Sequence, residues 1–239
     1  MKSEDIEFPI RINRYLALKG LSTRRGADEL IAKGVVKING KVAQLGDKVE
    51  EKDVVDVPAE TLEKVSSQYR YIAYHKPRGV STDVQEDSRS IRSELPALRG
   101  LFPLGRLDKD SHGLIILTND GRLTERLLHP SHAHEKEYHV RIDKPVTDTF
   151  IHHLERGVLI ERYKTKPAKA RRAGETIFNI TLTEGKKHQI RRMCAAEGRQ
   201  VIDLERIRIM NVKLGDLKEG AYRDIKGPEL ATLLKNIGL

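Results

Sequence analysis

The feature that most constrains the fold is the apolar run at residues 114–118, Leu-Ile-Ile-Leu-Thr, together with the acidic segment before it. A glycine precedes the run and an Asn-Asp-Gly turn follows it, so the run predicts a buried β-strand. The segment G-R-L-D-K-D-S-H-G, at residues 105–113, is then a loop attached to a core strand. If the loop is extended, alternation directs Leu107 toward the core and leaves Arg106 and Asp108 on the accessible side.

The length and charge of the chain favour two domains and an anionic partner. A chain of 239 residues can form two unequal domains, because single domains usually run to ~100–200 residues. Lysine and arginine number 44 against 35 aspartates and glutamates, which gives a formal net charge of +9. Such a surface attracts polyanions at long range, and nucleic acid is the commonest of them.

Membrane and disulfide signals are both missing from the sequence. No apolar segment approaches the ~20 residues that cross a bilayer, and the first residues form no apolar signal region. We therefore expect a soluble, cytoplasmic protein that does not bind membranes. The single cysteine, Cys194, excludes an internal disulfide and a cysteine-rich zinc site, so we expect it to fill space in a core.

Residues 10–57 predict a small module of helices and hairpins. Apolar spacing indicates a helix over residues 11–19, and Ser22 is the expected N-cap of a second helix. An Asn-Gly pair at residues 39–40 is the strongest two-residue hairpin signal, and residues 53–57 add an alternating strand. So small a module buries little surface and is poorly suited to be an enzyme by itself.

The same module carries a cluster of basic side chains that predicts RNA binding. Its candidate RNA contacts are Arg14, Lys19, Arg24, Arg25, Lys37 and Lys41. The alternative is a basic face that is merely solvated. RNA docking is favoured by the run R-x-N-R-Y-L-A-x-x-G-L-S-T-R-R-x-A-D-E-L-I-x-x-G-V-V-x-I-N-G-K, which resembles the alpha-L RNA-binding domain first known from a small-subunit ribosomal protein.

The rest of the chain predicts a second, larger domain at residues 69–239. Residues 58–68 are polar and lack sustained periodicity, so we expect a linker there. Strand and helix patterns then mix, which indicates an α+β domain with an extensive, largely antiparallel sheet. Helices are expected at residues 91–95, 123–128, 147–154, 187–197 and 228–237, and strands at residues 71–76, 135–142, 165–170, 176–183 and 201–212.

Two further segments supply groups that could complete a site around Asp108. Tyr138, in an alternating strand, offers a ring that stacks on an extruded base and a hydroxyl that moves a proton. Arg191 is the candidate partner of Asp108, because an arginine keeps a nearby carboxylate ionised and fixes its direction, and Ile190 would line the same site. Each residue alone has a plainer structural interpretation, as an acidic turn, a core tyrosine or a basic helix face. Only their combination favours a catalytic site.

Four motifs spread along the chain point to one family. They are K-P-x-G-V-S-T from Lys76, G-R-L-D followed by D-S-x-G-L-I-I-L-T-N-D-G, H-E-K-E-Y from His134, and L-E-R-x-R-I-M-N-V from Leu204. Together they resemble the RsuA/RluB/RluE/RluF group of bacterial pseudouridine synthases, over nearly the whole chain. The last two look closest to the RluF branch, which acts on large-subunit ribosomal RNA. The segment G-K-K-H-Q-I-R-R-M instead has the form of the group at large, so the target uridine stays open.

The resemblance implies that the enzyme isomerises a uridine within RNA and needs no cofactor. The glycosidic bond is broken, the uracil is turned, and its carbon 5 is joined to the sugar. By resemblance Asp108 is the catalytic aspartate, Tyr138 the stacking and proton-transfer residue, and Arg191 the partner of Asp108. Whether Asp108 attacks the sugar or the base, or abstracts a ribose proton, stays open. Further RNA contacts implied in the same way are Arg106, Lys76 and Arg192.

The expected partner is ribosomal RNA, with the large subunit first, and we expect a monomer with no obligate protein partner. Two alternatives stay open. One is a non-catalytic RNA-binding or ribosome-assembly factor that retains the fold, and the other is the same reaction on small-subunit ribosomal RNA or transfer RNA. The intact set of Asp108, Tyr138 and Arg191 favours the enzyme.

Two patterns that superficially suggest metal sites are set aside. Residues 108–119 have the outline of a calcium loop, but His112 replaces an oxygen ligand and an asparagine stands where the bidentate glutamate is required. His129, His132 and His134 could suggest zinc, yet an intervening proline breaks helical presentation and no cysteine joins them. We therefore expect no metal ion.

Overall fold

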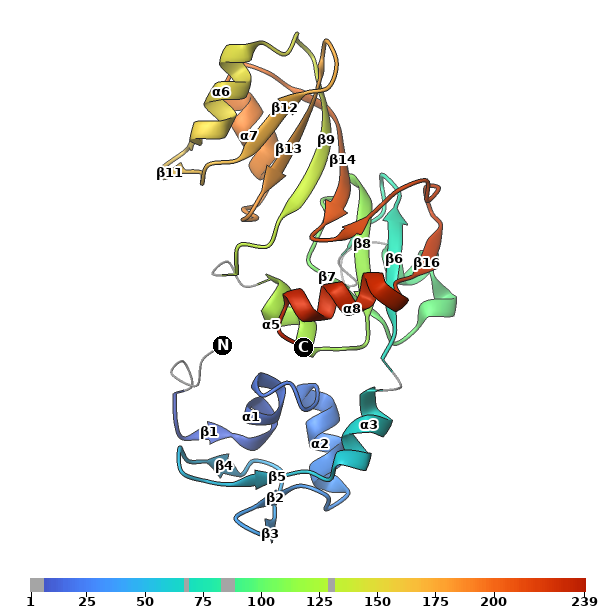
Figure 1. Cartoon of the computed structure of the whole chain (residues 1–239). Coiled ribbons are helices and arrows are strands. Elements are labelled where there is room, and N and C mark those ends of the chain that lie inside the picture. The colour runs from blue at the N-terminus through green and yellow to red at the C-terminus, as the bar shows by residue number, and fades with distance from the viewer. Residues whose placement is uncertain (1–6, 67–68, 83–88, 129–131) are drawn as a thin grey trace. The chain divides into compact units, whose positions relative to one another are not determined.

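The computed structural model describes residues 7–66, 69–82, 89–128 and 132–239 (Figure 1). The chain forms two compact units. The smaller contains the residues up to Arg70 together with Asn119–Glu125, and the larger contains Tyr71–Thr118 and Arg126–Gly238. Among the described residues, none of the helices combines the length and the hydropathy that a membrane span requires.

The smaller unit consists of short helices and strands around one apolar cluster. Its elements are β1 (Ile10–Arg11), α1 (Ile12–Leu18), α2 (Arg24–Ala32), β2 (Lys37–Ile38), β3 (Lys41–Val42), β4 (Lys48–Val49), β5 (Val55–Asp56) and α3 (Ala59–Ser66). Strand β1 pairs with β4, and β2 lies between β3 and β5 in an antiparallel sheet. Ile12 and Leu16 of α1 and Leu30 of α2 are buried in the shared core, as the helical spacing predicts.

Local signals in this unit were mostly correct, with one displaced cap. The Asn39-Gly40 turn is confirmed, since both residues have the positive φ, 51° and 79°, that a type I′ turn requires. The predicted cap Ser22 is wrong by one residue. Thr23 caps α2, its Oγ1 accepting from the backbone N–H of Gly26 at 2.9 Å, while Ser22 is fully buried.

The segment predicted to be a linker, residues 58–68, contains a helix that the sequence analysis did not expect. Helix α3 spans Ala59–Ser66, and the carbonyl of Pro58 accepts from the N–H groups of Thr61 and Leu62. Proline is favoured at a helix start because its fixed φ is already helical. It is followed by residues that form helices readily, namely alanine, glutamate, leucine and lysine. Their helix propensity is therefore sufficient for a helix although the apolar pattern is weak.

The larger unit is built on a mixed sheet, nine-stranded within the described residues, with strand order β12-β13-β9-β14-β8-β6-β16 and with β15 and β7 attached to β14 and β8 (Figure 1). Its elements are β6 (Tyr71–Lys76), α4 (Ile91–Glu94), the 3₁₀ helix η2 (Pro96–Leu98), β7 (Phe102–Leu104), β8 (His112–Thr118), α5 (Arg122–Leu128, shared with the smaller unit), β9 (Lys136–Ile142), α6 (Asp148–Arg156), β10 (Leu159–Ile160), β11 (Tyr163–Lys164), β12 (Lys169–Arg172), β13 (Ile177–Leu182), α7 (Gln189–Ala196), β14 (Val201–Ile209), β15 (Val212–Lys213), β16 (Tyr222–Asp224) and α8 (Gly227–Asn236). Neighbours are antiparallel except β14 and β8, which run parallel. The α+β prediction is confirmed.

Two apolar clusters support the two halves of this sheet. One lies where α6 and α7 pack on β9, β13 and β14, with Phe150 against Phe178 edge to face at 5.2 Å. Cys194 is buried in it as expected, and burial raises the pKa of its thiol to about 12. The other cluster joins β6 and β8 to α4. The predicted strand at residues 114–118 is confirmed as the buried part of β8.

Gly113 marks the closest approach of two strands. Its φ is +107°, and a Cβ added there would lie 2.4 Å from the carbonyl oxygen and 2.5 Å from the backbone nitrogen of Arg206 on β14. Backbone atoms cannot move aside as a flexible side chain can, so glycine is required where β8 meets β14.

We expect Gly113→Ala to destabilise the protein by more than about 3 kcal/mol, because the methyl group adds a backbone clash to an unfavourable φ. Urea unfolding followed by circular dichroism measures the change. Gly198→Ala is the matched control, since Gly198 has φ +69° with no atom within 4 Å of the added Cβ. It should cost only the strain, about 1–2 kcal/mol. Equal losses for the two variants would contradict the close approach.

Candidate active site

The larger unit contains a cavity of about 620 Å³ beside the predicted catalytic loop. This volume lies in the ~300–1,000 Å³ range of small-ligand sites. The cavity is lined by residues of the 105–108 loop, by Lys136 and Tyr138 of β9, by the segment from Glu184 to Ile190, and by Leu204 and Arg206 of β14. Segments far apart in the sequence therefore meet at one hollow with apolar walls and basic groups.

The side chains of the loop point as alternation predicts. Leu107 is buried, Arg106 is exposed, and Asp108 is partly exposed on the wall of the cavity. The loop backbone is held by hydrogen bonds from several elements. Thr82 Oγ1 donates to the carbonyl of Leu107 at 2.8 Å and accepts from its N–H at 3.2 Å. The N–H of Gly79 donates to the carbonyl of Lys109 at 2.8 Å.

The remaining carbonyls of this loop accept hydrogen bonds from two arginine side chains and from one backbone N–H in a turn. Arg206 Nη1 donates to the carbonyl of Arg106 at 3.3 Å, and Arg191 Nη2 donates to that of Asp110 at 3.1 Å. The carbonyl of Asp108 itself accepts from the N–H of Ser111 at 3.0 Å. Every carbonyl from 106 to 110 thus has a donor, which fixes the position from which the Asp108 carboxylate enters the cavity.

The predicted ion pair between Asp108 and Arg191 is wrong in this structure. Within the described residues, the carboxylate pairs with His188, whose Nδ1 lies 3.1 Å from Asp108 Oδ2. Arg191 contacts the loop through the Asp110 carbonyl and, at 3.4 Å, Ser111 Oγ. The reason is geometric. His188 stands at the start of α7 in a left-handed conformation, φ 51°, and thereby reaches the carboxylate before the helix brings Arg191 to the backbone.

The other predicted residues of the site divide into two groups. Tyr138, Ile190 and Arg106 line the cavity. Tyr138 also packs against the apolar cluster on β9, so it contributes both to the core and to the wall of the cavity. Arg192 is not part of the lining and pairs with Glu161 at 2.8 Å.

The prediction that Lys76 contacts RNA is contradicted, because its side chain is 0% exposed. Its Nζ donates to the carbonyls of Pro77 at 2.8 Å and Val80 at 2.7 Å, so it stabilises the turn after β6. Burial, followed by the charge of Arg206, lowers the pKa of Lys76 to about 8. A lysine at the end of a strand looks exposed in a sequence, and only the three-dimensional packing shows it enclosed.

Several cavity residues were missed by the sequence analysis. Arg206 is 2% exposed, donates from Nε to the carbonyl of Leu114 at 2.7 Å, and has an Nη2 without a partner among the described residues. Lys136 lines the same wall, and burial followed by Arg206 lowers its pKa. The motif from Leu204 contains Arg206, but a motif does not indicate that this arginine is turned inward.

A basic rim lies beside the Asp108 carboxylate. Lys186, Lys187 and His188 are exposed and line the cavity. Their loop is fixed by the buried Glu184, which accepts from Gln189 Nε2 at 2.7 Å, while Gln189 Oε1 accepts from the N–H of Lys186 at 2.9 Å. These cations can therefore hold a phosphate backbone near the cavity from a loop whose main chain is already fixed. In the sequence, the three adjacent basic residues of G-K-K-H-Q could have indicated this rim.

The candidate RNA contacts of the smaller unit are all exposed. They are Arg14, Lys19, Arg24, Arg25, Lys37 and Lys41, and they come from α1, its C-terminal end, α2 and the β2–β3 hairpin. The exposure is necessary for binding RNA and does not distinguish it from a solvated face.

Comparison with known families decides the class. Residues 70–196 match the family described as RNA pseudouridylate synthase, and residues 10–55 match the S4 domain. The chain belongs to the RNA pseudouridylate synthase family. It is an RNA pseudouridine synthase, an isomerase, and the non-catalytic alternative is not favoured.

The sequences of individual relatives are similar to this chain over most of their length. The chain is 43% identical over 230 residues to a dual-specificity RNA pseudouridine synthase RluF of Escherichia coli O6:H1, covering 95% of this chain and 79% of the relative. It is 35% identical to ribosomal large subunit pseudouridine synthase B of Bacillus subtilis, with 93% and 95% covered. A crystal structure of a pseudouridylate synthase matches with a TM-score of 0.68 at 30% identity, covering 95% and 99%.

The loop attachment gives a test that leaves all cavity side chains in place. Thr82→Val keeps the shape of the side chain but removes the hydroxyl, so the buried N–H and carbonyl of Leu107 lose this partner, at a cost of about 1–3 kcal/mol. If this loop presents a catalytic group, we expect the single-turnover rate to fall by about tenfold or more, because small displacements of such a group are costly, while RNA affinity stays the same.

Thr232→Val is the control for Thr82→Val. Thr232 is exposed and its hydroxyl donates to the carbonyl of Pro228 within α8, outside the cavity. Its rate should match that of the wild type. An unchanged rate in Thr82→Val would show that the hydroxyl does not position the loop.

Proposed function

We propose that this enzyme converts a specific uridine of large-subunit ribosomal RNA to pseudouridine, with Asp108 as the catalytic residue. The observation that carries the proposal is the Asp108 carboxylate on the wall of the cavity, extending from a loop whose carbonyls are all held by donors. The printed name of the Bacillus subtilis relative, a ribosomal large subunit synthase, supports the choice of RNA.

The cavity suits a base that has left its helix. Flipping a nucleotide costs a few kcal/mol, which stacking and phosphate contacts can offset. Tyr138 offers a ring and Ile190 an apolar wall on which uracil can stack, and Arg106 lies at the same opening. In our proposal Asp108 acts on the sugar or the base, and Tyr138 then removes the surplus proton from carbon 5 once the new bond has formed.

Arg191 takes a revised role in this proposal. It acts as a positioning residue that holds the backbone at Asp110. His188 is the residue that contacts the Asp108 carboxylate directly, through its Nδ1. Arg192 would contact RNA only if its pair with Glu161 opened. The hydrogen bond of Arg191 and the ion pairs of His188 and Arg192 support these roles.

We assign RNA docking to residues 10–57, joined through residues 58–68 to a catalytic domain at residues 69–239. The exposed cations of the smaller unit support this division of labour. The relative named as dual-specificity suggests that a second RNA should be tested beside large-subunit RNA. A cytoplasmic location, a monomeric state and independence from protein partners stay predictions.

Asp108→Asn tests the catalyst, because it keeps the size of the side chain and removes its charge. Wild type and variant would be incubated with unmodified large-subunit, small-subunit and transfer RNA, and pseudouridine would be mapped by chemical labelling and primer extension. We expect one or very few uridines of large-subunit RNA to be converted by the wild type and none by the variant, with RNA binding retained.

The outcomes of this experiment separate the parts of the proposal. Conversion by Asp108→Asn at the wild-type rate would refute Asp108 as the catalyst. Conversion confined to small-subunit or transfer RNA would retain the reaction and reject the large-subunit target. Asp110→Asn is the control, since Asp110 is exposed, does not line the cavity and should remain active.

A second prediction concerns the cations of α2. Arg24→Gln combined with Arg25→Gln should weaken RNA binding and reduce the slope of log affinity against log salt by up to about 2, because each phosphate contact contributes slightly less than one unit. The slope is measured by filter binding at several salt concentrations. Catalysis at saturating RNA should persist.

The matched control removes the same charge elsewhere on the smaller unit. Lys48→Gln combined with Lys52→Gln alters two exposed lysines outside the predicted set. If both pairs lowered the slope equally, the effect would reflect net charge rather than docking through α2.

A further inference from the structure

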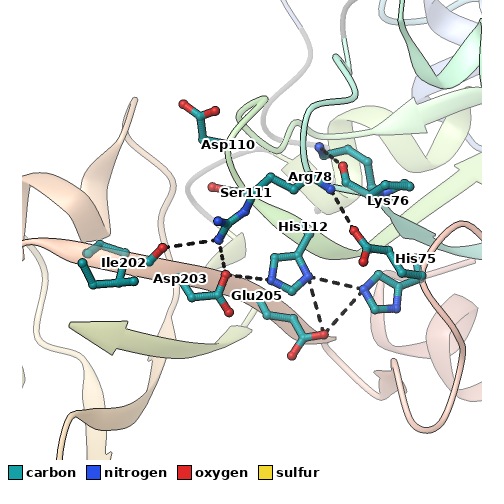
Figure 2. A network of polar contacts seen from close by, with 12 residues as sticks. His75, Lys76, Arg78, Asp110, Ser111, His112, Ile202, Asp203 and Glu205 are labelled. Carbon is teal, nitrogen blue, oxygen red and sulfur yellow. Dashed lines mark hydrogen bonds and ion pairs between the residues drawn. The ribbon is translucent and has the colours of Figure 1, made fainter. Parts of the chain in front are cut away.

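A cluster of two histidines and a glutamate lies on three adjacent strands of the larger unit, away from the cavity. His75 is the second-last residue of β6, His112 begins β8, and Glu205 lies on β14 directly opposite His112 in the parallel pair. Figure 2 shows the three side chains converging. None of them lines the cavity, whereas their neighbours Leu204 and Arg206 do. Since successive side chains of a strand point to opposite faces, the cluster lies on the other face of β14 from the cavity.

The three nearest ligand atoms form a triangle of the size that a zinc ion requires. His75 Nε2 lies 3.5 Å from His112 Nδ1, and Glu205 Oε1 lies 3.5 Å from the first and 3.8 Å from the second. The nearest point equidistant from the three atoms lies in their plane, about 2.1 Å from each, which matches the ~2.0–2.2 Å bonds of zinc to imidazole nitrogen and carboxylate oxygen. A small contraction of the triangle would place the ion out of this plane, as a tetrahedral site requires. The triangle therefore needs little rearrangement to bind the ion.

The outer nitrogens of both rings are already held by acceptors. His75 Nδ1 lies 2.8 Å from the carbonyl oxygen of Leu217, and His112 Nε2 lies 3.0 Å from Asp203 Oδ1. A carbonyl and a carboxylate only accept, so each outer nitrogen carries the proton. In the neutral imidazoles the inner nitrogens, His75 Nε2 and His112 Nδ1, then carry lone pairs that face each other and Glu205. A histidine that donates its second N–H to a carbonyl or carboxylate is the usual partner arrangement of a metal ligand.

The surroundings hold these groups in place. The two imidazoles stack at 5.8 Å with an interplanar angle of 11°. Arg78 Nη2 donates to Asp203 Oδ1 and thereby fixes the carboxylate that orients His112 (Figure 2). The side chains of His112 and Glu205 remain 17% and 23% exposed, so a water molecule can reach the remaining position of a four-coordinate ion.

We propose that His75, His112 and Glu205 form a zinc-binding site that links β6, β8 and β14. Two imidazoles with one carboxylate suit zinc and exclude magnesium and calcium as preferred ions, because those ions select oxygen ligands. This proposal departs from the expectation that the chain binds no metal.

The sequence analysis considered three different histidines as zinc ligands. His129 lies outside the described residues, and His132 and His134 stack at 5.7 Å without forming a three-ligand group with described side chains.

The experiment measures binding of zinc alone to the full-length protein, prepared without a histidine tag and freed of metal by a chelator. Competition with a chromophoric chelator gives the affinity and stoichiometry. We expect one equivalent for the wild type. Asp203→Asn should weaken binding by about 10–100-fold, which is the usual cost of removing an outer partner, and His112→Gln should weaken it further. Zinc should also raise the melting temperature of the wild type and not that of His112→Gln.

His132→Gln is the matched control, because it removes one imidazole from the other stacked pair. It should bind zinc as the wild type does. Equal affinity in the wild type and His112→Gln, or a loss confined to His132→Gln, would overturn the proposal.

A measurement on the unaltered protein covers the case in which His112→Gln does not fold. One equivalent of cobalt(II) should give the strong visible absorption of four-coordinate cobalt, and zinc should displace it. A weak six-coordinate spectrum, or no uptake, would overturn the site. Glu205→Gln, at a partly exposed side chain, provides a second ligand variant with the same expected loss.

Discussion

The structure of the active site depends on the attachment of one short loop to a buried strand. The five carbonyls from Arg106 to Asp110 are each bound by a donor, and the donors come from the turn after β6, from the loop itself, from α7 and from β14. Because these carbonyls already accept hydrogen bonds, a rearrangement of the loop would break bonds without forming better ones. As the proposed catalyst, the carboxylate of Asp108 would therefore be presented to substrate without a large conformational cost at the moment of reaction, which is the condition for electrostatic and positional catalysis.

Features set by short-range chemistry could be predicted from the sequence. The Asn39-Gly40 hairpin, the helix expected at residues 147–154 and the buried strand β8 all follow from a few neighbouring residues, and the structure has each of them. The mixture of strand and helix patterns extended this to the α+β architecture, and the family motifs extended it to the residues that meet at the cavity. Tyr138, Ile190 and Asp108 come from separate elements, and their co-location could be inferred only because the motifs resembled a known family.

Features set by long-range pairing could not be predicted. The partner of Asp108 depends on the left-handed turn at His188, and the enclosure of Lys76 depends on how β6 packs. Helix α3, inside the segment expected to be a linker, was missed for another reason, because it is short and the helix propensity of its residues outweighs their weak apolar pattern. The His75–His112–Glu205 cluster has no spacing signature at all. Its members adjoin only because β8 lies between β6 and β14 in the sheet.

Strand β14 serves two sites with one backbone. Leu204 and Arg206 face the cavity, and Asp203 and Glu205 belong to the histidine cluster on the opposite face. Register shifts in the pairing with β9 bracket this stretch, between Val201 and Asp203 and between Arg206 and Arg208. A period of two means that inserting or deleting a single residue within the stretch would exchange the faces and deliver carboxylates to the cavity and an arginine to the histidines. Within this stretch an extra residue could be absorbed without turning the strand over only at the two bulges.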